Sequence, residues 1–155
     1  MKLIDWSVLK YFKPYGTSDN WGDVDKLDAV LLMKVDDLRE FVGSPIHITS
    51  GYREGDVKEH GHGLALDIIC PAIPLLDFYL AAERFGFTGL GVYSHWKWDG
   101  IVTGGLHTDV RSLGLKFGRH NTEYKGARWF CYKDDQGKQV YTTLNKDNLK
   151  KYNVI

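Results

Sequence analysis

The stretch EHGHGLALDII, residues 59–69, decides how this chain is read. Two histidines and an aspartate stand among small residues, and the stretch then continues as an apolar segment. Side chains on a strand alternate between its two faces, so Asp67 points away from the face that carries Leu66 and Ile68. A carboxylate on an otherwise buried strand needs a positively charged or hydrogen-bonding partner. The stretch is therefore either a metal-binding segment or a histidine-bearing loop followed by an ordinary strand.

The segments on both sides of this stretch predict a mixture of helices and strands. Apolar residues recur every three or four positions from Asp25 to Val42, which predicts a helix with Asp25 as its N-cap. Further helices are predicted at Leu75–Phe85 and Asp147–Tyr152, strands at Ile46–Tyr52, Leu64–Ile69, Gly89–Tyr93 and Leu106–Val110, and loops at 53–63 and 94–105. Because the helices and the strands are segregated, we expect an α+β fold with a small antiparallel sheet and flanking helices.

Length and composition limit the classes of protein to consider. The chain has 155 residues, of which 43% are hydrophobic, and this predicts one domain over 1–155 with an irregular aromatic arm at 1–24 and a hairpin at 129–142. The formal net charge is zero, so no nucleic-acid partner is expected. Neither a membrane span of roughly 18 apolar residues nor a secretion signal is evident, so no membrane partner is expected either. Cys70 and Cys131 are expected to be buried, free thiols.

A second predicted strand also carries metal-competent side chains. Within Leu106–Val110, His107 and Asp109 share one face. Imidazole and carboxylate groups suit zinc, so His60, Asp67 and His107 together could form a site whose fourth position stays open, as in catalytic zinc sites. The alternative is a buried aspartate bonded to backbone or arginine, with both histidines at the surface. Spacing alone leaves these two interpretations open.

The motifs around these candidates extend the pattern along the chain. They are Leu38-Arg39, Gly43 with Pro45, Ser50–Arg53, the set His60/Gly63/Ala65/Asp67, the set Gly89/Gly91/Tyr93, and the pair His107/Asp109. In this order they resemble the family of zinc D-Ala-D-Ala carboxypeptidases and L-alanyl-D-glutamate endopeptidases, which belongs to a wider group with lysostaphin and the hedgehog signalling domain. The resemblance covers residues 25–111, and the combined pattern is more specific than any one motif.

The resemblance implies that the protein is a zinc metallopeptidase. It implies that His60, Asp67 and His107 bind Zn²⁺ and that the substrate is a peptide of bacterial peptidoglycan. Many members of the family are phage lysins or wall hydrolases associated with virions. With no secretion signal evident, we therefore expect a protein that stays cytoplasmic until lysis, or one that is a virion component.

The resemblance also implies roles for residues beside the metal. Arg53 is assigned as a catalytic residue, because a fixed guanidinium aimed at developing negative charge stabilises that charge. A salt bridge from Arg53 to Glu54 or Asp56 is the plainer alternative. Ser50 and Tyr93, which belong to the matched motifs, are assigned to substrate binding.

Two positions depart from the family pattern. Lys58 stands where many members have a serine, and only six residues separate Arg53 from His60, so the loop that lines the substrate groove is short. Gly104 stands where well-studied members have the glutamate or aspartate that acts as general base. We expect Asp109 to have a functional role, either as a substitute base or as a group that orients a ligand. Other candidates for the base are Asp99, Glu54, Asp56 and Glu59.

The remaining features have more than one interpretation. The family pattern uses only His60 as a metal ligand, so His62 is not proposed as one. His62 either faces water, which we favour, or forms a hydrogen bond with substrate. The aromatic residues Tyr93, Trp96 and Trp98 form either a stacking wall for a substrate or part of the core. Gly104, in place of the usual general base, and the short loop motivate a rival hypothesis. In it the protein is a catalytically impaired zinc-binding module that docks on the cell wall as a structural component.

Overall fold

A six-stranded sheet forms the centre of the computed structural model, which describes residues 4–112 and 126–155. Its strands are β1 (His47–Ser50), β2 (Ala65–Ile69), β3 (Gly89–Tyr93), β6 (Gly105–Asp109), β7 (Ala127–Lys133) and β8 (Gln139–Thr142), and a separate ribbon consists of β4 (Lys97–Trp98) and β5 (Ile101–Val102). The α-helices are α1 (Ala29–Val42), α2 (Leu75–Glu83) and α3 (Lys146–Lys151), and short 3-10 turns are η1 (Trp6–Val8), η2 (Val24–Lys26) and η3 (Glu59–His62). The predicted α+β class is confirmed.

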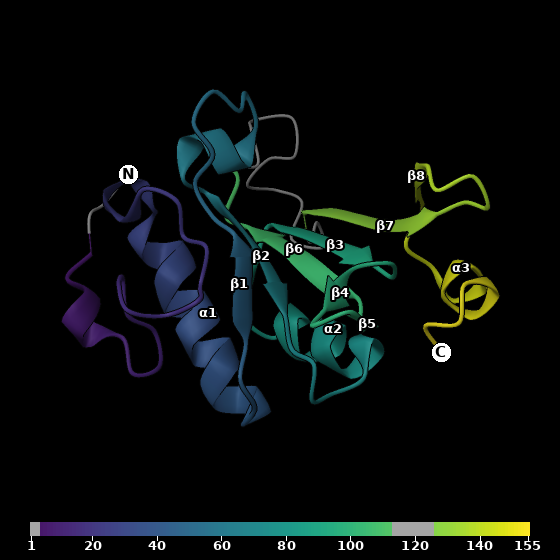
Figure 1. Cartoon of the computed structure of the whole chain (residues 1–155), viewed down its shortest axis with the longest axis horizontal. Coiled ribbons are helices and arrows are strands. Elements are labelled where there is room, and N and C mark those ends of the chain that lie inside the picture. The colour runs from purple at the N-terminus through teal and green to yellow at the C-terminus, as the bar shows by residue number, and fades with distance from the viewer. Residues whose placement is uncertain (1–3, 113–125) are drawn as a thin grey trace, which may run out of the picture.

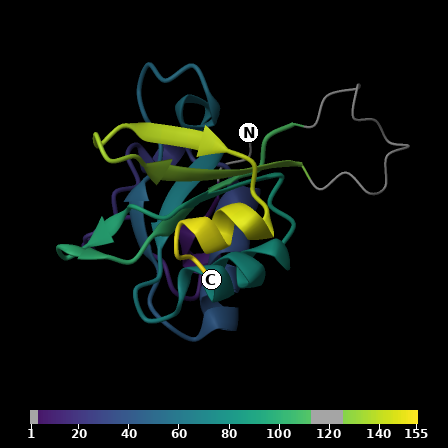
Figure 2. The ribbon, with the colours of Figure 1, turned by 90° about the vertical axis from the view of Figure 1, so that its right-hand side faces the viewer.

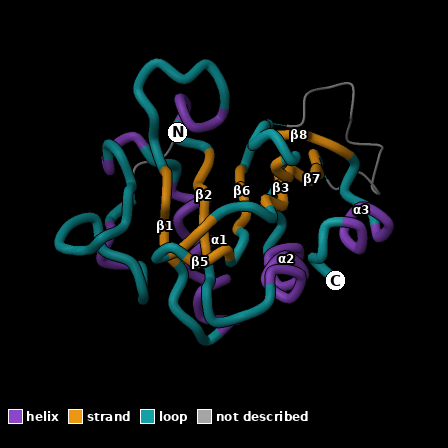
Figure 3. The backbone as a smooth tube through the Cα atoms, turned by 45° about the vertical axis from the view of Figure 1, so that its right-hand side comes forward, coloured by secondary structure: helices purple, strands orange, loops and turns teal. Residues whose placement is uncertain are grey.

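The strand order is β1-β2-β6-β3-β7-β8, and Figure 3 shows the strands side by side in this order. Every neighbouring pair in the sheet is antiparallel except β3 and β7, which are parallel. The sheet is therefore mixed, and the expected antiparallel arrangement holds for every pair except β3 and β7. In the sheet, β7 lies beside β3 and runs in the same direction. The alternation of side chains along a strand does not indicate which strand becomes its neighbour, or in which direction that neighbour runs.

The helices α1 and α2 supply the apolar partners of one sheet face. The core unites residues of α1, α2 and the strands; its fully buried members include Leu31, Leu38, Leu66, Ile68, Phe78, Leu90, Leu106 and Phe130. In Figure 1 the N-terminal segment and α1 lie on the β1 side of the sheet, and the β7–β8 hairpin forms its other end, with α3 nearby. In Figure 2, α3 lies below that hairpin. Since Leu66 and Ile68 face this core, Asp67 between them faces the opposite side of the sheet.

The first helix begins later than its sequence predicts. Asp25, the expected N-cap, lies within η2, and Asp28 caps α1 instead, since its Oδ1 accepts hydrogen bonds from the backbone N–H groups of Val30 and Leu31 at 2.9 and 3.2 Å. The error has a simple cause, because the chain offers an aspartate at both positions and either one can cap a helix.

The predicted N-terminal arm, of which residues 1–3 lie outside the described part, covers the edge of the sheet. Its backbone bonds to strand β1, with the N–H of Asn20 donating to the carbonyl of Ile48 at 2.9 Å. The buried carboxylate of Asp36 on α1 accepts from the backbone N–H groups of Lys10 and Tyr11 at 3.0 and 2.9 Å. The bond to Ile48 pairs a backbone group of the edge strand β1, and the bonds to Asp36 hold the arm on α1.

The predicted loop at 94–105 contains the short ribbon of β4 and β5. Asp99 and Gly100, both with positive φ (50° and 77°), form its two-residue turn. The C-terminal hairpin is present as β7 and β8. Cys70 and Cys131 are both free and buried. In the described ranges, none of the helices has the length and apolar character needed to cross a bilayer.

Candidate metal centre

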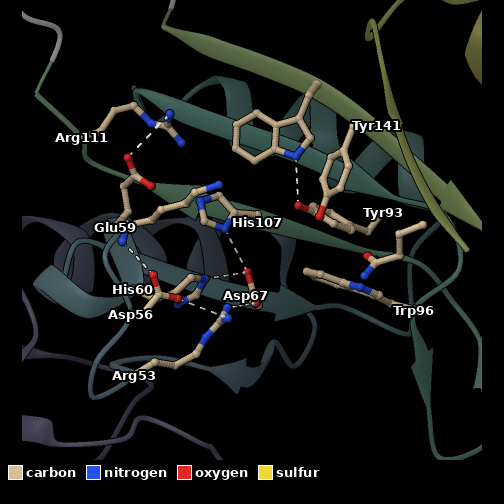
Figure 4. Close-up of a pocket in the computed structure, with 13 residues that line it drawn as sticks. Arg53, Asp56, Glu59, His60, Asp67, Tyr93, Trp96, His107, Arg111 and Tyr141 are labelled. Atoms are coloured by element: carbon tan, nitrogen blue, oxygen red, sulfur yellow. Dashed lines mark hydrogen bonds and ion pairs between the residues drawn. The ribbon is translucent and has the colours of Figure 1, made fainter.

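Three side chains that are far apart in the sequence converge on the face of the sheet opposite α1 and α2. His60 comes from η3, Asp67 from β2 and His107 from β6, and all three are buried. Oδ1 of Asp67 lies 3.2 Å from Nε2 of His60 and 3.1 Å from Nδ1 of His107. One potential ligand atom from each residue lies within 4.8 Å of the other two. Figure 4 shows both imidazole rings directed at the carboxylate.

Two glycines allow η3 to place His60. Gly63 ends the turn with a φ of 70°, a conformation that is costly for other residues. A Cβ atom on Gly61 would lie 1.6 Å from the carbonyl oxygen of Asp56, so the turn approaches this backbone more closely than a side chain permits. The pattern HGHG therefore has a structural cause, and its second histidine, His62, is not among the residues that line the cleft.

The register of the sheet sets the other two ligands. Ser50 pairs with Asp67, Asp67 with His107, His107 with Gly91 and Gly91 with Trp129, so these five residues form one row across the sheet. A Cβ atom on Gly91 would lie 2.3 Å from the ring of Trp129, so the absence of a side chain there leaves room for the indole beside the histidine.

The hydrogen bonds of both rings determine which nitrogen faces Asp67. Nδ1 of His60 lies 2.8 Å from the carbonyl oxygen of Gly51, which can only accept, so Nδ1 carries the proton. Nε2 of His107 lies 2.8 Å from Oδ2 of Asp109, which also acts as acceptor when ionised. In each ring the other nitrogen faces Asp67, where it can donate to the carboxylate when it is protonated and bind a metal ion when it is deprotonated.

The charges of the metal-free group support this arrangement. Burial by itself would raise the pKa of Asp67, but hydrogen bonds from His107 and His60 lower it to about 2. Burial by itself would lower the pKa of His107, but its bonds to Asp109 and Asp67 raise it to about 9. Asp67 and His107 thus stabilise the charged forms of each other. A divalent cation bound beside Asp67 could replace the positive charge that the protonated His107 supplies.

Asp109 lies behind His107 and is completely buried. Its carboxylate accepts a hydrogen bond from Nε of Arg111 at 2.9 Å in addition to its contact with the histidine. Burial alone would raise its pKa, and the bonds from His107 and Arg111 lower it to about 2. A Cβ atom on Gly89 would lie 2.1 Å from this carboxylate, so the glycine makes room for it. The geometry suits the orienting role, because the oxygens of Asp109 point at partners and not into the cleft.

Arg53 stands at the rim of the group. Its Nη2 donates to Oδ2 of Asp67 at 3.2 Å, its Nε donates to Oγ of Ser50 at 3.0 Å, and its Nη1 lies 3.6 Å from Oδ2 of Asp56. The side chain is 47% exposed, so it reaches both the triad and solvent. The salt bridge to Asp56 and the position at the triad are therefore compatible, and Ser50 acts as a support for the guanidinium.

A cleft of about 740 Å³ opens over the triad. Tyr93, Trp96, Trp129 and Tyr141 line one end, where Tyr93 and Trp96 stack with ring centroids 4.2 Å apart. Trp98, the third aromatic residue of the predicted wall, stacks on His47 at 3.8 Å instead and does not line the cleft. Trp129, Tyr141 and Arg111 are cleft residues that the sequence did not suggest. The placement of Trp129 and Tyr141 depends on strand pairings over long distances, whereas Arg111 follows β6 directly and bonds to Asp109 two residues before it.

The position of the expected general base has no access to the cleft. Gly104 has a φ of 68°, and a Cβ atom there would lie 2.5 Å from the side chain of Leu75. Of the proposed substitutes, Asp56 and Glu59 line the cleft. Glu54 is 82% exposed beside Lys26, and Asp99 lies in the β4–β5 turn; neither lines it.

No protein-family model matches the chain, and no significant match was found among curated proteins or solved structures. The site therefore stands on its own geometry. Within residues 4–112 and 126–155, His60, Asp67 and His107 form a buried group that could hold a metal ion.

Proposed function

We propose that this protein is a zinc-dependent peptidase that hydrolyses peptide bonds of bacterial peptidoglycan, of the D-Ala-D-Ala carboxypeptidase or L-Ala-D-Glu endopeptidase type. The observation that carries the proposal is the pair of histidines whose outer nitrogens are bonded to Gly51 and Asp109, so that the inner nitrogens converge on Asp67. The motifs in residues 25–111 that resemble this peptidase family supply the substrate class.

The donor set fits zinc. Two imidazoles and one carboxylate are ligands that zinc prefers, and the cleft leaves its open side accessible to a substrate. Zinc held in this way acts as a Lewis acid that polarises a carbonyl group and activates water. The contribution of the chain is to fix both imidazoles through Gly51 and Asp109, so that little reorganisation is needed on binding.

The other charged residues at the cleft have separate roles in the proposed reaction. Arg53, held by Ser50, would bind the carbonyl oxygen of the substrate and stabilise the negative charge that develops on it. Asp56 and Glu59 line the cleft and are the carboxylates that could accept a proton from water there. Asp109 serves His107 and Arg111, so we give it a positioning role.

The first experiment is mass spectrometry of purified muropeptides after incubation with zinc-loaded protein. We expect a change in product masses that a chelator abolishes and that identifies the bond. His60→Ala is expected to abolish turnover, and His62→Ala, which changes a histidine two positions away, is expected to retain it. Unchanged muropeptides with one zinc bound per chain would contradict the peptidase and favour the non-catalytic module.

Arg53→Ala separates catalysis from metal binding. We expect turnover to fall by about 10²-fold or more, because the lost group stabilises charge in the transition state, while zinc stays bound. Arg84→Ala is the matched control, since Arg84 stacks over Phe41 outside the cleft. Equal turnover in wild type and Arg53→Ala would remove the arginine from the mechanism.

A specific observation favours the rival function of a catalytically impaired module. Gly104 carries no carboxylate and does not line the cleft, and a Cβ atom there would lie 2.5 Å from the side chain of Leu75. In that case the cleft would bind wall peptide without cutting it, and the protein would serve as a zinc-stabilised component of a virion. The muropeptide experiment decides between the two.

A further inference from the structure

The cleft has two ends of different chemistry. The charged side chains Arg53, Asp56, Lys58, Glu59 and Arg111 line the cleft near the triad, whereas the lining residues on the strands beyond it, Tyr93, Trp129, Gln139 and Tyr141, are neutral, as is Trp96. Figure 4 shows Tyr93, Trp96 and Tyr141 grouped on the side of Asp67 that faces away from Glu59 and Arg111. A ligand group that binds at the aromatic end is therefore uncharged, and it presents a flat or ring-shaped surface to these side chains.

The rings at this end are fixed and carry polar groups at their edges. Nε1 of Trp129 donates to the hydroxyl of Tyr93 at 3.0 Å, and Tyr93 stacks on Trp96. Tyr141 meets the edge of Tyr93 at 6.2 Å between centroids and is itself 61% exposed. Gln139 adds an amide beside them. Aromatic faces with hydroxyl and amide groups at their borders match a pyranose ring, which has an apolar C–H face and polar substituents around it.

Some of the side chains that form this aromatic wall of the cleft lie outside the segment that carries the family resemblance. Trp129 lies on β7, Gln139 and Tyr141 on β8, and the resemblance ends at residue 111. The ring of Trp129 lies 5.1 Å from that of His107, so the wall adjoins the triad directly. An extended peptide residue spans only about 3.5 Å. A sugar held against Trp129 would therefore bring only the first bonds of its attached peptide to the triad.

We propose that the aromatic end of the cleft, formed by Tyr93, Trp96, Trp129 and Tyr141, is a subsite for an N-acetylated sugar ring of the glycan strand that bears the peptide. This proposal rests on the proposed function, since it names the part of the peptidoglycan substrate that binds at the aromatic end of the cleft. It selects the bonds close to the glycan as the ones attacked, and it excludes the distal D-Ala-D-Ala bond.

The test is isothermal titration calorimetry on the zinc-loaded full chain with N-acetylmuramic acid as the probe. Lactic acid, which matches its acidic substituent without the ring, is the ligand control. We expect N-acetylmuramic acid to bind at least about tenfold more tightly than lactic acid, and Tyr141→Ala to weaken its binding by about tenfold. Trp98→Ala, which removes an aromatic side chain outside the cleft, should retain wild-type affinity.

Equal affinity for the two ligands, or an affinity that Tyr141→Ala leaves unchanged, would overturn the subsite. Tyr141 is exposed, so its replacement should not prevent folding, and Trp96→Ala provides a second test of the same wall. The muropeptide experiment separates the two proposals. Cleavage without ring-dependent binding refutes the subsite alone, whereas ring-dependent binding without cleavage refutes the peptidase and leaves the subsite standing.

Discussion

At the scale of single residues, Gly61 couples the backbone of the loop to the position of His60. Its φ is not positive, so a change to alanine tests contact and not backbone strain. The Cβ atom of Gly61→Ala would collide with the carbonyl of Asp56, which is backbone and cannot turn aside. We expect a loss of about 2 kcal/mol in the free energy of unfolding, together with weaker zinc binding. Urea unfolding and a chelator competition measure the two effects.

Gly55→Ala is the control in the same loop, because a Cβ atom there would meet no heavy atom within 4 Å. Its φ of 79° predicts a cost of about 1 kcal/mol from strain alone, without an effect on zinc affinity. If Gly55→Ala weakened zinc binding as much as Gly61→Ala, the close contact would not be what places His60.

Asp109→Asn tests the support of His107. The amide can no longer act at both oxygens as acceptor for the histidine and for Arg111, so the ring loses part of its orientation. We expect zinc affinity to fall by about 10- to 100-fold, measured by competition with a chromophoric chelator. Asp99→Asn, in the exposed turn of the β4–β5 ribbon, should leave the affinity unchanged, and a similar loss there would indicate a nonspecific effect of charge.

At the scale of elements, the start of α1 offers a direct comparison of two aspartates. Asp28→Ala removes two capping bonds and should lower the free energy of unfolding by about 1 kcal/mol. Asp25→Ala removes the carboxylate that the sequence equally suggests as the cap, and it should change stability by less than about 0.5 kcal/mol. Chemical denaturation of both variants measures the difference, and a larger loss for Asp25→Ala would contradict the assigned helix start.

Most elements of the fold could be predicted because their signals are local. The spacing of apolar residues in α1 and the alternation in β2 and β6 identify these elements and the faces they bury. The β4–β5 ribbon was missed, although Asp99-Gly100 is a typical signal for a hairpin turn. The segment lies between two predicted strands and is predicted to be a loop, because two-residue strands are too short to show a period.

At the scale of the whole molecule, the limit of prediction is strand pairing. The candidate ligands His60, Asp67 and His107 could be proposed from motifs, since each lies in a recognisable local pattern. Trp129 and Tyr141 could not, because their place in the cleft depends on the parallel pairing of β3 with β7 and on the pairing of β7 with β8. Composition and periodicity carry no record of which strands become neighbours.

The metal site also connects three separate parts of the chain, so metal binding should stabilise the whole fold. A ligand that binds only the folded state adds about 2.7 kcal/mol at a concentration 100 times its dissociation constant. We therefore expect the melting temperature to fall when a chelator removes zinc and to recover when zinc is restored. Differential scanning calorimetry with and without the chelator measures this shift.

The adjacent histidines of the HGHG segment make this prediction specific. His60→Ala removes one of the three converging side chains, so its melting temperature should no longer respond to zinc. His62→Ala leaves all three in place and should respond as the wild type does. A zinc response of equal size in both variants would show that the stabilising ion binds elsewhere. Loss of the response in His62→Ala alone would assign the ligand to the second histidine.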